Sequence, residues 1–152
     1  MQTTQVSPAS VLAIQAVNLT APKEFLVKRR GVSPVEADEL AVEYTRFLQI
    51  CATNMEVRFP VSAQVDEFWH AHMLYSKEYR EMCEEVFGAL FNHNPVTSEE
   101  QRLLLMPDYI NNTLPTYERM FGQEPSQKFW PKAGPNAAIC TGDSDNDSGD
   151  DD

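Results

Sequence analysis

Apolar side chains recur every three or four positions along most of the chain, which is the spacing of one face of an α-helix. The clearest helix start is the run Ser-Pro-Val-Glu at positions 33–36. Its serine can cap the helix, its proline suits the first helical position, and its glutamate can complete a capping box. We expect this helix to carry an apolar stripe from Leu40 to Cys51 and to end near Asn54.

Similar patterns predict helices on both sides of this one. We expect short helices over residues 9–19 and 23–30, helices opened by Ser62, Ser76 and Ser98, and a last helix from Tyr109 to Phe121. Evidence for strands is thin, because the chain has no long alternating run and no Asn-Gly hairpin. The predicted fold class is therefore all-α, a single compact helical domain of about five or six helices.

The two ends of the chain have a different composition. Residues 1–8 are polar and contain Pro8, so we predict a flexible N-terminus. From residue 132 onward glycine, asparagine, serine and aspartate dominate, which predicts a disordered acidic tail over residues 132–152. The helical domain is then expected over residues 9–131, within the size range of one domain.

The composition narrows the class of protein. The net charge is −11, and six of the 23 acidic residues lie in the last ten positions. A lone basic cluster at residues 28–30 fits a helix end better than a nucleic-acid surface. The three cysteines form no disulfide framework, no signal peptide is evident, and no run approaches the roughly 20 apolar residues of a membrane span. We expect a cytoplasmic protein that binds neither nucleic acid nor membrane.

The histidines are the strongest candidates for functional residues. All three histidines of the chain, His70, His72 and His93, fall within 24 residues. Neutral imidazole is a good ligand for zinc, copper or iron, and Cys83 is a further ligand candidate nearby. A zinc or other transition-metal site formed by these four residues is therefore one hypothesis, with Asp66, Trp69 and Tyr79 as supporting residues.

Helix geometry restricts this hypothesis. Residues two positions apart on a helix differ by about 200° around its axis, so His70 and His72 should point in opposite directions. His72 falls on the apolar stripe, while His70 falls on the flank one turn after Asp66. Cys83 would lie about 16 Å from His72 along a straight helix, so the two can meet only if the chain bends near Ser76. A buried His72 that hydrogen-bonds to Tyr75 or Tyr79, to His93 or to a carbonyl is the structural alternative.

An ordered series of motifs also carries a family likeness. Trp-His-x-His, Cys, Phe-Gly and His-x-Pro follow one another over residues 69–95 and resemble the glycine-rich domain-containing protein-like family. The likeness extends from about residue 23 to residue 132. It implies a single helical domain and marks the histidine segment, but it supplies no reaction. The chain lacks the glycine- and cysteine-rich run with which members often end.

Two functions from different classes follow from these observations. The first is a histidine-centred binding or interaction module for a protein or small-molecule partner, with a structural zinc as one option. The second is a metal-dependent enzyme in which His70, His72 and His93 leave one coordination position open. A third reading, an adaptor whose acidic tail reaches basic surfaces, rests on the tail alone. The fourth ligand distinguishes a structural metal from a catalytic one.

Overall fold

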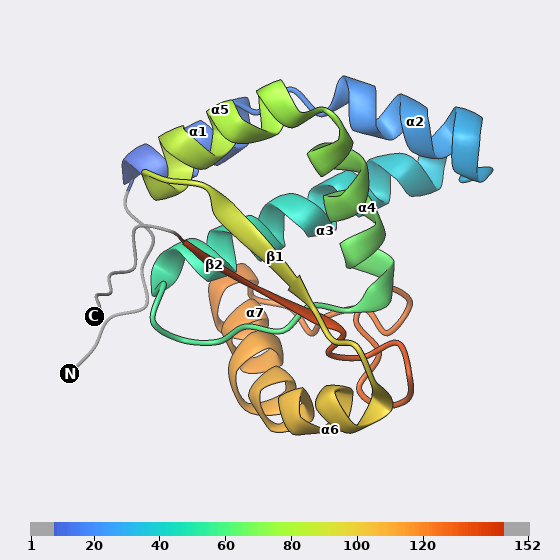
Figure 1. Cartoon of the computed structure of the whole chain (residues 1–152), viewed down its shortest axis with the longest axis vertical. Coiled ribbons are helices and arrows are strands. Elements are labelled where there is room, and N and C mark those ends of the chain that lie inside the picture. Colours follow the sequence, from blue (N-terminus) through green and yellow to red (C-terminus); the bar gives the residue numbers. More distant parts are fainter. Residues whose placement is uncertain (1–7, 145–152) are drawn as a thin grey trace.

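The computed structural model describes residues 8–144, and helices predominate in it (Figure 1). In chain order the elements are α1 (Pro8–Ala16), α2 (Thr20–Arg30), α3 (Pro34–Thr53), α4 (Ala63–Leu74), α5 (Ser76–Phe87), β1 (Phe91–Pro95), α6 (Glu99–Asp108), the π-helical turn η1 (Tyr109–Thr113), α7 (Leu114–Phe121) and β2 (Cys140–Ser144). The predicted helical character of the domain is confirmed. None of the helices between residues 8 and 144 has the length and apolar character that crossing a membrane requires.

Local capping explains where the helices begin and end. The side chains of Ser33, Ser62 and Ser98 each accept a hydrogen bond from the backbone N–H three residues later, at 3.1, 3.2 and 3.1 Å. Gly31 and Gly122 end α2 and α7 in the left-handed conformation, with φ of 73° and 70°. A side chain is disfavoured there, which is why glycine occupies both positions.

The helices enclose one aromatic core. Figure 1 shows α1 beside α5 and α2 beside α4, with α6 and α7 at the opposite end of the molecule. The segment after α7 returns to the core, since Phe129 is 6% exposed and Trp130 is fully buried. The largest fully buried side chains come from almost every element, and they include Trp69, Trp130, Tyr44, Tyr109, Tyr117, Phe47 and Phe68.

A small antiparallel sheet departs from the all-α prediction. β1 pairs with β2, so that Phe91 lies opposite Ser144, His93 opposite Gly142, and Pro95 opposite Cys140. Neither strand alternates apolar and polar residues in the way that marks a strand in sequence. The pairing depends instead on tertiary packing, which outweighs weak strand propensity.

Residues 132–144 belong to the folded domain, although the sequence predicted disorder from residue 132. Ala137, Ala138 and Cys140 are fully buried. The backbone of Val61 exchanges hydrogen bonds of 2.9 Å with Cys140 and Ile139. Small side chains fit this tight space, and so a segment poor in large apolar residues is nevertheless ordered. The predicted flexible N-terminus, apart from Pro8, and the predicted tail beyond Ser144 lie outside the described residues.

Candidate metal centre

Helix α4 and strand β1 bring three of the predicted residues together. Asp66 and His70 lie one turn apart on α4, and the His70 Nε2 atom is 3.1 Å from Asp66 Oδ2. His93 reaches them from β1, with its Nε2 atom 2.7 Å from Asp66 Oδ1 and 3.0 Å from His70 Nε2. Two imidazole nitrogens and one carboxylate therefore face a common point.

The three side chains differ in their contact with solvent. The Asp66 side chain is 4% exposed and that of His93 is 10% exposed, whereas the His70 side chain is 55% exposed. Asp66 therefore needs partners, because a buried carboxylate is costly unless it is paired or binds a metal. The two histidines are the partners that the fold supplies.

Cys140 is a further donor that the sequence did not indicate, and it groups with Asp66 and His93 but not with His70. Its Sγ atom and ligand atoms of Asp66 and His93 all lie within 4.8 Å of one another. The pKa of the Cys140 thiol is raised well above its usual value. Burial is the larger cause, and the charge of Asp66 is the second. Cys140 is the first residue of β2, so the assignment of residues 132–152 to a disordered tail removed it from consideration. The short run of small and apolar residues just before it was the available signal.

Trp69 and Tyr79 hold the strand that carries His93. The Trp69 Nε1–H group donates to the Tyr79 hydroxyl at 2.9 Å, and this hydroxyl donates to the Phe91 carbonyl at 2.6 Å. The Trp69 ring also contacts the His93 ring edge-on, with centroids 4.5 Å apart. Trp69 and Tyr79, two of the three predicted supporting residues, therefore position β1 from the core side.

His72, a predicted ligand, lies outside this cluster. It points into the core, where its Nδ1 atom is 2.8 Å from the Tyr44 hydroxyl, and within residues 8–144 its Nε2 atom has no hydrogen-bond partner. Burial lowers the pKa of His72 to about 4, so the ring is neutral near pH 7. The predicted opposite orientation of His70 and His72 is confirmed, but the tyrosine partner is Tyr44 and not Tyr75 or Tyr79.

Cys83, the other predicted ligand, also lies apart. The chain does bend near Ser76, as a shared site for His72 and Cys83 would require, because α4 ends before Tyr75 and α5 begins after it. However, α5 then directs Cys83 into the core. Burial raises the pKa of its thiol. A neutral buried thiol of this kind is inert. The structure thus brings together Asp66, His70 and His93, and it adds Cys140 in place of His72 and Cys83.

A comparison with known protein families assigns the chain to one of them. A family model described as UCP032817-like matches residues 15–103, a span that includes Asp66, His70 and His93 but ends before Cys140. No curated protein and no solved structure matches the chain. The likeness to the glycine-rich domain-containing protein-like family stays a prediction. The matched span covers more than half of the sequence, and the chain therefore belongs to the UCP032817-like family.

Proposed function

We propose that this chain is a metal-binding module that holds a zinc-type ion between α4 and the β1–β2 sheet. The observation that carries the proposal is the convergence of Asp66, His70 and His93, whose facing N and O atoms are 2.7–3.1 Å apart. Ligand atoms placed tetrahedrally about zinc, at bonds of about 2.0–2.1 Å, are ~3.3 Å apart. Small movements of these side chains would accommodate an ion.

Cys140 is the fourth donor of the proposed site. It groups with Asp66 and His93, so the His70 side chain has to move toward Cys140 for all four to share one ion. Nitrogen, oxygen and sulfur donors together are typical of zinc, and four protein ligands are typical of a structural site. A coordinating thiol loses its proton, so metal binding at Cys140 overcomes the effect of burial on its pKa. In this state the ion joins α4, β1 and β2, which agrees with a binding module rather than an enzyme.

Elemental analysis of the purified, untagged protein tests the proposal. We expect about one zinc per chain, lost in His93→Ala, His70→Ala and Asp66→Asn. Cys83→Ala is the matched control, because it removes a buried thiol outside the cluster and should keep the metal. A double variant should cost little more stability than a single one, since residues that serve one site are not additive. Three results together would contradict the proposal: no metal in the purified protein, no effect of chelators on stability, and no effect of His70→Ala on stability. The cluster would then be a metal-free network.

A metal-dependent enzyme is the second candidate, and the exposure of His70 favours it. A pocket of about 410 Å³ lies beside the cluster and is lined by Asp66, Glu67, His70, Gln64 and Asn136 among others. If Cys140 does not bind the ion, three ligands leave a position open for water. Cobalt substitution distinguishes the two cases. A thiolate-to-cobalt absorption band that Cys140→Ser removes and Cys83→Ser keeps indicates the structural site, and absence of this band indicates the open one.

A further inference from the structure

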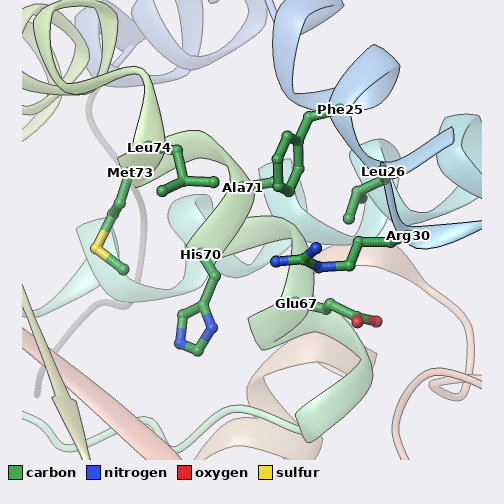
Figure 2. Close-up of a pocket in the computed structure, with 8 residues that line it drawn as sticks. All are labelled: Phe25, Leu26, Arg30, Glu67, His70, Ala71, Met73 and Leu74. Carbon is green, nitrogen blue, oxygen red and sulfur yellow. The ribbon is translucent and has the colours of Figure 1, made fainter. Parts of the chain in front are cut away.

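A second pocket lies on the other flank of α4, where this helix meets α2. Its volume is about 390 Å³. The lining includes Phe25, Arg30, Glu67, His70, Met73 and Leu74. Figure 2 shows the His70 ring projecting away from Phe25 and Leu26, and its Nε2 atom is occupied by Asp66 and His93. The pocket therefore shares His70 with the metal centre, whereas Asp66 and His93 are not part of its lining.

One side of this pocket is apolar. Phe25 is half-buried, and Leu74 exposes 61% of its surface although it is a large aliphatic residue. Met73 extends the same surface, and Ala71 is buried beneath it. Hydrocarbon that covers Leu74 and Phe25 removes apolar area from water, which favours a ligand with an apolar body.

The other side holds a cation without an acidic partner. The Arg30 guanidinium lies over the Phe25 ring, 4.9 Å from its centroid. Within residues 8–144 it forms no ion pair, and its one hydrogen bond is a long contact of 3.5 Å to the Arg29 carbonyl. The guanidinium carries five N–H donors in a planar fork that matches a carboxylate. Most of these donors are therefore available to a ligand.

Glu67 is the one acidic residue in the lining, and it is exposed. Its charge opposes an anionic ligand. Arg30 is the cation in the same lining, and within residues 8–144 no ion pair joins it to Glu67. Glu67 therefore weakens anion binding without reversing the preference of the pocket.

We propose that this pocket binds a small monocarboxylate with an apolar body. The carboxylate pairs with the Arg30 guanidinium, and the hydrocarbon chain lies against Phe25 and Leu74. The inference goes beyond the proposed metal function and does not depend on it, because none of these three residues belongs to the metal centre.

Titration calorimetry with hexanoate tests the proposal. We expect saturable binding of one hexanoate per chain, with hexanol and hexylamine weaker. Butyrate, which is two methylenes shorter, should bind about sixteenfold more weakly, because each buried methylene contributes about fourfold. Arg30→Gln should weaken hexanoate binding at least about tenfold, as expected for a charge-assisted hydrogen bond. Glu67→Gln should strengthen it severalfold by removing the opposing charge.

Arg29→Gln is the matched control, since it removes the same charge from the neighbouring residue, which does not line the pocket. It should change the affinity less than twofold. An equal loss in Arg29→Gln and Arg30→Gln, tighter binding of hexylamine, or the absence of saturable binding would overturn the proposal. Metal content measured on the same samples keeps the two proposals separate, because hexanoate binding should persist in protein that contains no metal.

Discussion

At the scale of single residues, His70 and His72 show how helical phase decides chemistry. They are two positions apart on α4, yet His70 is more than half exposed beside Asp66 and His72 is fully buried beside Tyr44. The buried ring has lost the water that would stabilise its cationic form. His72 is therefore a neutral structural residue, while His70 holds its ring at the surface beside Asp66 and His93.

The lowered pKa of His72 predicts acid sensitivity. The unfolded chain has a histidine pKa of 6.5 and the folded chain about 4, so below pH 6.5 the unfolded state binds the extra proton. Stability from this group is complete above pH 6.5 and is lost as the pH falls toward 4. We expect His72 alone to reduce the free energy of unfolding by about 2 kcal/mol between pH 7 and pH 5.

Urea unfolding of the wild type and of His72→Gln at both pH values isolates this contribution. Glutamine can still hydrogen-bond to Tyr44 but does not titrate, so the stability gap between the two proteins should narrow by about 2 kcal/mol at pH 5. The other titratable groups, including Asp66, His70 and His93, are present in both proteins, and their effects cancel. An unchanged gap would show that His72 is not a neutral, buried group.

Trp69 contributes both to the core and to the metal centre. It is fully buried, stacks on Phe91 with centroids 5.2 Å apart, and contacts His93. Trp69→Ala should reduce the free energy of unfolding by about 3–5 kcal/mol, the usual range for a large aromatic truncation in a core. Denaturant unfolding measures this loss. Trp69→Phe, which keeps an aromatic ring, should lose clearly less, and a well-folded Trp69→Ala protein would place the residue on a functional surface instead.

At the scale of elements, the β1–β2 sheet is the part that assembles the site. It carries His93 on one strand and Cys140 on the other, and it joins residues about fifty positions apart in the sequence. Gly142 makes this pairing possible, because a Cβ atom there would collide with the Phe91 ring. The ring cannot easily move aside, since it packs on Trp69 and on Phe87.

Gly142→Ala therefore should separate the strands or displace Phe91. We expect a loss of about 1–3 kcal/mol in stability, the usual cost of overpacking, together with weaker metal binding. Thermal melts and metal titrations measure the two effects. Thr141→Ala, at the preceding position of β2, is the control and should leave metal affinity close to that of the wild type. A Gly142→Ala protein with unchanged stability would contradict the observed strand register.

Local signals account for what the sequence could predict. Ser33, Ser62 and Ser98 cap helices through hydrogen bonds within three residues, so their role is visible in the chain itself. The pairing of His70 with Asp66 is equally local, one helical turn apart. The position of His93 and Cys140 depends on a sheet whose strands have no local signature. For that reason the site was predicted with His72 and Cys83 rather than with Cys140.

At the scale of the whole molecule, the segment after α7 is an integral part of the domain. It returns Trp130 to the core, where the Trp130 Nε1–H group donates to Glu43 at 2.9 Å. It then passes Arg102, whose guanidinium donates to the Gly134 and Ala137 carbonyls at 2.7 and 2.9 Å. These contacts lead the chain back to Val61 and β1, so that the last strand closes the site formed by α4.

Truncation after Pro131 tests this account. The deletion removes β2 with Cys140, exposes Phe91, and leaves the buried Arg102 without its carbonyl acceptors. We expect a loss of at least about 3 kcal/mol, or roughly 10 °C in Tm for a domain of this size, and loss of the metal. A chain that ends at Ser144 keeps every one of these contacts and serves as the control, with stability and metal content close to those of the full chain. Calorimetric melts and zinc analysis of both proteins measure the difference. If the shorter chain melts like the full one, residues 132–144 are not part of the stable fold, and the ion, if bound, is held by α4 and β1 alone.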